Sequence, residues 1–312
     1  MRFAVIGRNE TLFAAAEHMA AQGHEIGLVV TAKAAPEYTK TVEDYRALAE
    51  RHHAPFFVTP RIHDIAVSLA EMPPLTVALS MNYTSLIPQS IIDWFPLGIL
   101  NAHGGDLPRY RGNACQAWAI LNGEDKIGLC IHRMIGGALD SGAIIARDYY
   151  PLQPATTITQ VYAWLYQRIP LLFVDAVTAL MQDAGFSLTQ QSPEPADALR
   201  CYPLRPDDGA IDWNQPAAMI LRRINAFTHP YGGAYCRYAG EKLVIWAAAQ
   251  VEDQERFLAV PGQVVSVGGD YVDVATGQGK LRLTQAAYRG VIVPPSQIIR
   301  SIRERLEHGR NV

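Results

Sequence analysis

Two short segments of this 312-residue chain combine residue types that can perform acid–base chemistry. The first, residues 101–112, reads NAHGGDLPRYRG and places an amide, Asn101, two positions before an imidazole, His103. The apolar run before them predicts a strand, in which side chains two residues apart point to the same face. The second segment, residues 138–142, reads ALDSG and supplies a carboxylate, Asp140, from a glycine-bounded turn.

An amide, an imidazole and a carboxylate together suit acyl transfer to an amine. The Asn101 amide can donate a hydrogen bond to a developing oxyanion, and His103 can take the proton of the attacking amine. Asp140 would orient the imidazole and favour its charged form. From residue types and spacing alone, the expected chemistry is acyl transfer or hydrolysis in the cleft of an α/β protein.

These motifs resemble those of the folate-dependent formyltransferases, a family that includes methionyl-tRNA formyltransferase and the amino-sugar N-formyltransferases. The family carries Asn-x-His, then Leu-Pro-x-(Tyr/Trp)-Arg-Gly, then Leu-Asp-(Ser/Thr)-Gly, and residues 107–112 and 139–142 match the second and third motifs. Residues 208–213 and 230–234 look like the opening of the family's C-terminal domain, so the resemblance covers nearly the whole chain. The departure is Gly105-Asp106, where the family usually has Ser-Leu.

Apolar runs alternate with helical patterns along the first half, which predicts an α/β fold with a doubly wound, mostly parallel sheet. A polar, proline-rich stretch indicates a linker, and short strands separated by glycine suggest a small β-barrel beyond it. We expect a catalytic domain over residues 1–188, a linker over residues 189–203 and a barrel domain over residues 204–312. The resemblance implies that the first domain is Rossmann-like and that the barrel is OB-like.

The resemblance also implies a set of site residues. It makes Asn101, His103 and Asp140 catalytic and N10-formyltetrahydrofolate the formyl donor. In the family, the pterin pocket is lined largely by backbone groups, and the matching residues here are Asn82, Leu86, Ile87, Ile135, Gly136 and Gly137.

Three further residues are candidates for contact with the acceptor substrate. Arg109 and Arg111 either bind a substrate phosphate or face solvent, and Asp106 is the extra carboxylate of this chain. We expect His132 to be structural. The remaining histidines show no metal-ligand spacing, so no metal is expected.

Several protein classes are disfavoured. The first strand is followed by Gly7-Arg8-Asn9, without the G-x-G-x-x-G of a dinucleotide fold, and the chain has no P-loop motif. With 49% hydrophobic and 18% charged residues, the chain can bury two compact cores. No signal-peptide pattern and no apolar stretch of about 20 residues is present. The four cysteines are widely separated, so we expect buried, reduced thiols. Together these features predict a cytoplasmic protein with no membrane partner.

The acceptor is less constrained than the reaction. The tRNA enzyme usually has a basic insertion after the second strand, but residues 31–43 carry only Lys33 and Lys40 against Glu37 and Glu43. With two positive and two negative side chains, this segment has no net positive charge to attract a phosphate backbone. Our first choice is therefore the amino group of a nucleotide-linked amino sugar.

Other functions stay open. Methionyl-initiator tRNA is favoured by the C-terminal domain and by the basic stretch of residues 298–310, which we expect to be a solvated helix that could also mediate homodimerisation. A hydroxyornithine-type siderophore precursor is a third acceptor. Water in place of the amine would make the protein a formyltetrahydrofolate hydrolase. A non-enzymatic folate-binding protein would not need the three converging groups.

Overall fold

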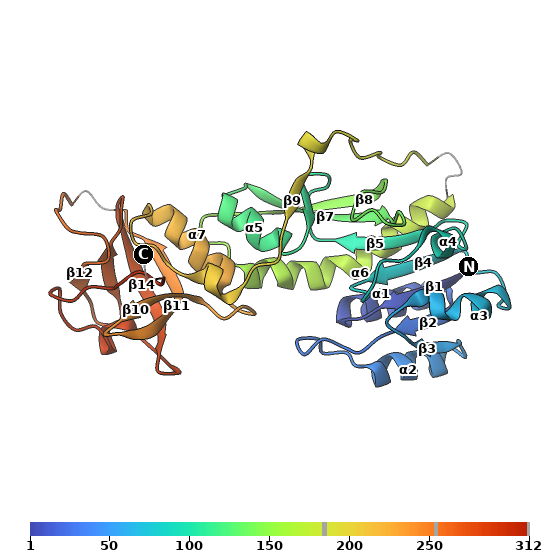
Figure 1. The fold of residues 1–312 in the computed structure, drawn as a ribbon, viewed down its shortest axis with the longest axis horizontal. Coiled ribbons are helices and arrows are strands. Elements are labelled where there is room, and N and C mark those ends of the chain that lie inside the picture. The colour runs from blue at the N-terminus through green and yellow to red at the C-terminus, as the bar shows by residue number, and fades with distance from the viewer. Residues whose placement is uncertain (183–185, 253–254, 311–312) are drawn as a thin grey trace. The chain divides into compact units, whose positions relative to one another are not determined.

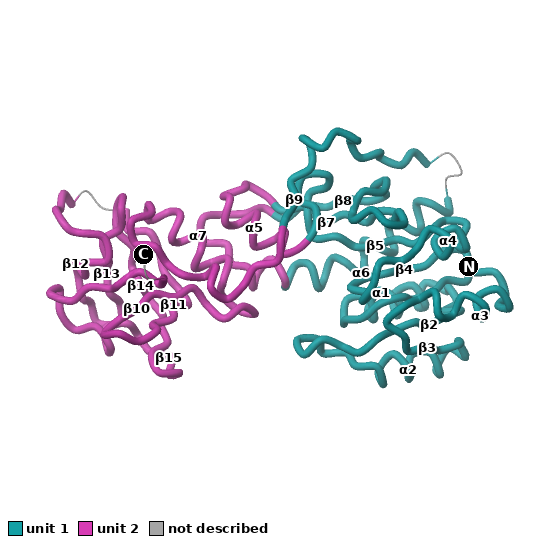
Figure 2. Tube along the Cα trace, in the orientation of Figure 1, with its two compact units in different colours: residues 1–112, 127–150, 163–201 teal, residues 113–126, 151–162, 202–312 magenta. Residues whose placement is uncertain are grey.

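The computed structural model describes residues 1–182, 186–252 and 255–310. They form two compact units, teal and magenta in Figure 2. The first comprises residues 1–112, 127–150 and 163–201, and the second comprises residues 113–126, 151–162 and 202–312.

These units differ from the domain boundaries predicted from the sequence. Helix α5 (Cys115–Asn122) packs against α7 (Ala217–Phe227), so the chain contributes to the second unit before it completes the first. The predicted linker, residues 189–203, lies mostly in the first unit, where β9 (Leu199–Cys201) pairs with β6 (Tyr110–Gly112) in parallel. Its backbone is thus tied to the catalytic motif, a pairing that local composition does not reveal.

A seven-stranded sheet organises the first unit, in the order β3-β2-β1-β4-β5-β7-β8 (Figure 1). The first five strands in that order are mutually parallel, and β7 runs antiparallel to β5. The predicted doubly wound, mostly parallel fold is confirmed. The strands are β1 (Arg2–Gly7), β2 (Glu25–Thr31), β3 (Phe56–Val58), β4 (Val77–Met81), β5 (Ile99–His103), β7 (Lys126–Arg133) and β8 (Ile144–Pro151).

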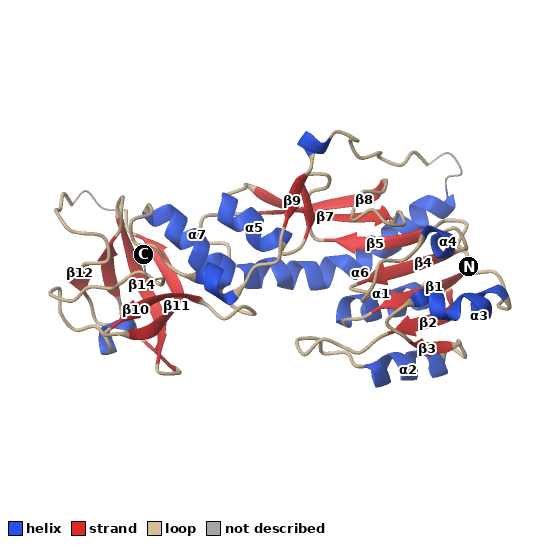
Figure 3. Ribbon diagram, in the orientation of Figure 1, coloured by secondary structure: helices blue, strands red, loops and turns tan. Residues whose placement is uncertain are grey.

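Helices lie beside these strands (Figure 3) and begin where side chains satisfy their free N–H groups. Asn9 caps the first helix by accepting from the Leu12 N–H at 3.0 Å, and Thr41 and Asp44 form a capping box on the second. Residues 62–70 form a 3₁₀ turn followed by a short helix. The helices are α1 (Glu10–Ala21), α2 (Val42–Arg51), η1 (Ile62–Ile65), α3 (Ala66–Ala70), α4 (Gln89–Ile92) and α6 (Ile158–Gln182).

The position of the predicted catalytic motif, residues 101–112, follows from the strand order. The chain runs outward through β2 and β3 on one side of β1, then returns to add β4 and β5 on the other. Ligands bind outside the carboxyl ends of the strands at such a switch point. The Asn101–His103 pair lies at the carboxyl end of β5, which is the edge of the sheet where such ligands bind.

The second unit is built on an antiparallel sheet in the order β10-β11-β14-β13-β12, with β15 on β14. Its inward side chains, among them Leu243, Val274 and Leu281, are fully buried. The strands are β10 (Ala234–Tyr238), β11 (Glu241–Gln250), β12 (Val264–Val267), β13 (Val272–Ala275), β14 (Lys280–Tyr288) and β15 (Val291–Val293).

The basic C-terminal stretch is not the helix that we predicted. The Glu307 and Arg237 backbones exchange hydrogen bonds of 2.9 and 3.2 Å at the β10 edge. The Leu306 N–H donates to the Gly262 carbonyl at 2.8 Å and the Val264 N–H to the Glu304 carbonyl at 3.1 Å, at the β12 edge. The segment thus connects the two edge strands and closes the sheet into the predicted barrel. Unpaired strand edges favour such cover over an isolated helix.

All four cysteines are buried and unbridged. No helix among residues 1–182, 186–252 and 255–310 has both the length and the apolar character that crossing a membrane requires.

Candidate active site

Strand register brings three polar side chains to one face of the sheet. In the antiparallel pairing of β5 with β7, Asn101 lies opposite His132 and His103 lies opposite Cys130. Directly opposed residues share a face, as do residues two apart along a strand. Asn101, His103 and His132 therefore point the same way, and the two imidazole rings lie 6.4 Å apart between centroids.

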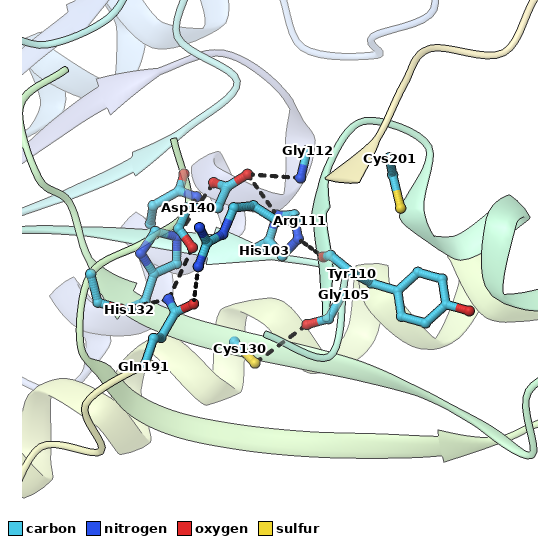
Figure 4. A network of polar contacts seen from close by, with 12 residues as sticks. His103, Gly105, Tyr110, Arg111, Gly112, Cys130, His132, Asp140, Gln191 and Cys201 are labelled. Atoms are coloured by element: carbon cyan, nitrogen blue, oxygen red, sulfur yellow. Dashed lines mark hydrogen bonds and ion pairs between the residues drawn. The ribbon is translucent and has the colours of Figure 1, made fainter. Parts of the chain in front are cut away.

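Asp140 reaches this face from the turn after β7 (Figure 4). Its Oδ2 lies 3.5 Å from His103 Nδ1 and accepts a hydrogen bond from the Gly112 N–H at 3.2 Å. Its Oδ1 lies 3.6 Å from His132 Nε2. Asp140 has a φ of 49°, in the left-handed region. The structure thus brings together all three predicted catalytic side chains.

His132 joins the cluster and orients Asn101, a role that the sequence analysis did not assign. Its Nδ1 lies 2.9 Å from the Arg133 carbonyl, which can only accept, so Nδ1 carries a proton. In neutral His132 the other nitrogen, Nε2, then accepts from the Asn101 amide N–H at 3.1 Å. The second N–H of the Asn101 amide takes no part in this hydrogen bond. The sequence shows that His132 lies on the same face of its strand as Cys130. Only the register with β5 shows that this face is the one that carries Asn101 and His103.

His103 is held by a backbone carbonyl. Its Nε2 lies 2.6 Å from the Tyr110 carbonyl oxygen and donates to it, so in the neutral ring Nδ1 is the nitrogen without a proton. The side chain is 8% exposed. The nitrogen that faces Asp140 is therefore the one that can accept a proton.

Gly105 makes the contact between His103 and Tyr110 possible. A Cβ at Gly105 would lie 2.2 Å from the Tyr110 oxygen and 2.5 Å from His103 Nε2, so the serine usual in the family would collide with both.

We expect Gly105→Ala to lower kcat/KM by roughly 10- to 100-fold, because small displacements of catalytic groups are costly. It should also cost about 1–3 kcal/mol of unfolding free energy. Gly269→Ala, where a Cβ meets nothing within 4 Å, is the control.

The electrostatics set the resting protonation of the pair. Burial lowers the pKa of the His103 imidazole, and the opposing effects of the Asp140 carboxylate and the Tyr110 carbonyl do not cancel it. Burial alone would raise the pKa of the Asp140 carboxyl. Its contacts with His132, His103 and the Gly112 N–H outweigh this and hold that pKa below its usual range. At neutral pH a neutral imidazole therefore faces an ionised carboxylate.

We expect His103 to titrate below 6.5, the ordinary pKa of histidine. The ring is then mainly neutral at pH 7, and kcat/KM should fall only as the pH drops through that lower value. NMR titration of labelled histidine, assigned with His103→Gln, measures this pKa directly. In Asp140→Asn the pKa should fall further, because the carboxylate charge raises it. A His103 pKa above 6.5 would contradict the assignment of a neutral base.

The residues predicted to bind the folate lie on two neighbouring segments. The Gly136 N–H donates to Gln89 Oε1 at 2.8 Å, and a Cβ at Gly136 would lie 2.4 Å from the Gln89 backbone nitrogen. This contact places the turn at residues 135–138 against the end of the loop at residues 82–88. Among the described residues, no group of three metal-ligating side chains is arranged to hold a metal ion.

These candidates differ in exposure. Leu86 is 65% and Ile135 45% exposed, whereas Ile87 is 2% exposed and packs in the core of the first unit, so Ile87 can offer a ligand only its backbone. The Asn82 carbonyl accepts from Arg8 Nε at 2.9 Å. Gly137 has a φ of 78°. Binding of the folate by Gly137 and the other candidates stays a prediction.

The substrate candidates have clear local partners. Asp106 Oδ1 accepts from Arg147 and from the Tyr149 hydroxyl, both at 3.1 Å, which gives the carboxylate that replaces the usual leucine a structural role. Arg111 donates to Gln191 Oε1 at 2.9 Å. Arg109 is exposed. Contact of these three residues with an acceptor stays a prediction.

Comparison with known proteins decides the family. The model described as "Formyl transferase" matches residues 1–177, which include the whole cluster, and the model "Formyl transferase, C-terminal domain" matches residues 203–303. The chain belongs to the formyl transferase family. The family predicted from the motifs is confirmed, and the chain is a formyltransferase by both of its domains.

Sequence relatives in this family include two methionyl-tRNA formyltransferases. That of Idiomarina loihiensis is 32% identical over 262 residues, covering 81% of this chain and 80% of the relative. That of Nitrosococcus oceani is 29% identical over 254 residues, covering 80% and 76%.

Solved structures with the same fold include sugar N-formyltransferases. WlaRD, a sugar 3N-formyl transferase, superposes with a TM-score of 0.68 at 15% identity, covering 91% of this chain and 97% of that one. The N-formyltransferase from Helicobacter canadensis, solved with folinic acid and dTDP-3-aminofucose, gives 0.65 at 14%, covering 90% and 98%. A variant of HypX from Aquifex aeolicus gives 0.60 at 19%, and this chain spans about half of its length, 49%.

Proposed function

We propose that this protein transfers a formyl group from N10-formyltetrahydrofolate to a primary amine. The convergence of Asn101, His103 and Asp140 at the carboxyl end of β5 carries this proposal. The three side chains lie inside the segment that matches the family model. The residues that the family resemblance assigns to the pterin pocket lie on the 82–88 loop and the 135–138 turn, which are linked by the hydrogen bond from the Gly136 N–H to the Gln89 side chain.

Each side chain has a distinct task. When bound, N10-formyltetrahydrofolate supplies the formyl carbon that the amine attacks. Asn101, oriented by its hydrogen bond to His132, donates its second amide proton to the oxyanion that develops on the formyl oxygen. His103 takes the proton that the amine loses, at Nδ1, and the Asp140 carboxylate stabilises the imidazolium. The proton then passes to the departing nitrogen, so that no net proton is gained or lost.

For the acceptor we favour the amino group of a nucleotide-linked amino sugar. In the segment between β2 and α2, Lys40 Nζ lies 3.4 Å from Asp44 Oδ1 and 4.4 Å from the centre of the Phe13 ring. Lys33 is accompanied by Glu37 in the same segment. This region therefore offers little positive potential to a nucleic-acid backbone, whereas Arg109 is exposed beside the catalytic motif and suited to one phosphate group.

Methionyl-initiator tRNA is the second candidate, because the two sequence relatives above are named methionyl-tRNA formyltransferases. The C-terminal barrel domain, which matches the family model, is available in either case. Activity assays with each acceptor distinguish these two candidate functions.

The test is release of tetrahydrofolate from N10-formyltetrahydrofolate with a panel of nucleotide-linked amino sugars and, separately, with methionyl-initiator tRNA. Acceptor-dependent release with an amino sugar supports our first choice. Release only with the charged tRNA overturns the choice of acceptor and keeps the reaction. Equal release with no acceptor present identifies a hydrolase and refutes transfer.

A further inference from the structure

The segment after α6 lies against the turn that carries Asp140. The Ile144 and Thr189 backbones exchange hydrogen bonds of 2.8 and 3.0 Å, so residue 189 is attached to the first residue of β8. Further along, β9 pairs with β6. The stretch between these two attachments therefore passes beside the turn that carries Asp140, and its residue Gln191 contacts that turn.

Gln191 uses its whole amide in this position (Figure 4). Its Nε2 donates to the Asp140 carbonyl at 2.9 Å and to the Gly142 carbonyl at 2.7 Å. Its Oε1 accepts from the Arg111 guanidinium at 2.9 Å. Carbonyls only accept and a guanidinium only donates, so these partners fix the orientation of the amide. No other uncharged side chain of this length supplies two donors and an acceptor.

These contacts join the two parts of the His103–Asp140 pair. Arg111 follows Tyr110, whose carbonyl holds His103 Nε2, and Gly112, whose N–H donates to Asp140, follows Arg111. On the other side, Gln191 holds the backbone of Asp140 itself, a residue with a left-handed φ. Such a conformation persists only where the surroundings hold it. Gln191 is one of the groups that hold it.

We propose that Gln191 is a positioning residue, which holds the Asp140 turn and the Arg111 strand together so that the Asp140 carboxylate stays against His103. Gln191 acts through the backbone of Asp140 and touches neither reacting group. Its effect on turnover rests on the proposed function, whereas its effect on the His103 environment does not.

The test is a double-mutant cycle with Gln191→Met, which keeps the length of the side chain and removes both donors and the acceptor. In the otherwise unchanged protein, kcat should fall by roughly 10- to 100-fold with the donor KM nearly unchanged. In an Asp140→Asn background the same change should have less than about a twofold effect, because residues that act as a unit are not additive. Gln190→Met, at the exposed neighbouring position, is the matched control.

Equal losses in the two backgrounds would show a general structural role and overturn the proposal, as would an unchanged kcat in Gln191→Met. Gln191→Glu provides a second variant if Gln191→Met is poorly folded, since it keeps the acceptor for Arg111 and loses both donors to the turn; it should show the same non-additivity. NMR of the labelled His103 ring keeps the test independent of turnover. Its resonances should move in Gln191→Met and not in Gln190→Met, and unmoved resonances would overturn the inference even in a protein that transfers no formyl group.

Discussion

Replacing His103 with alanine is expected to lower kcat by about 10²- to 10⁴-fold, the usual contribution of a positioned general base. The buried ring is held between the Tyr110 carbonyl and the Asp140 carboxylate, so it is poised to take one proton in a defined direction. The other imidazole nitrogen of the cluster, His132 Nε2, lies 3.1 Å from the Asn101 amide and is hydrogen-bonded to it. The loss should be seen in single-turnover rates, where product release does not limit.

Folate binding should survive this change, since the residues predicted to bind the donor lie on other segments. Binding of the donor by titration calorimetry, compared with the unchanged protein, checks this point. His63→Ala, at a side chain that is 61% exposed on η1, is a control for the loss of a histidine as such. A thermal unfolding curve shows whether the variant is folded. A kcat within threefold of the unchanged value in a folded His103→Ala protein would remove His103 from the reaction.

Replacing Asn101 with aspartate is expected to lower kcat by about 10²- to 10³-fold, the cost of removing one oxyanion donor. Aspartate has nearly the shape of asparagine, but it has no N–H to donate and carries a negative charge. At 3.1 Å from His132 Nε2, its charge would stand where the Asn101 amide now donates a hydrogen bond. Both effects oppose the build-up of negative charge on the formyl oxygen.

Asn101→Ala separates the two effects, because alanine removes the donor without adding a charge. We expect alanine to be slow and aspartate to be at least as slow, with donor KM little altered in both, since the interaction forms mainly in the transition state. Steady-state kinetics with saturating acceptor measure both parameters. An Asn101→Asp protein that retains the full rate would show that the oxyanion is stabilised elsewhere.

Much of the fold followed from local patterns in the sequence. Apolar runs alternating with helical segments predicted the parallel part of the first sheet, and the Asn101-x-His103 spacing at a strand end predicted their shared face. Glycine-bounded turns marked where Asp140 would be presented. These features depend on residues close together in the chain, where period and turn chemistry are informative.

The parts that were missed depend on long-range pairing. His132 enters the cluster only because β7 runs antiparallel to β5 in one register, and a shift by one residue would turn it to the other face. Gln191 lies in a stretch whose proline-rich composition indicates a linker, and its contacts are with residues 49 to 80 positions away. The basic C-terminal stretch was predicted to be a solvated helix, but its backbone forms bridges at Arg237 and Gln263 instead.

Formyl transfer itself can be followed with a ¹³C-labelled formyl group on N10-formyltetrahydrofolate in the presence of each acceptor class. We expect the label to appear on the acceptor nitrogen as a formamide, with one tetrahydrofolate released for each formamide formed, and we expect Asp140→Asn to slow this step. Label that appears as formate at the same rate with and without an acceptor, or that stays on the donor with every acceptor, would rule out formyl transfer to an amine.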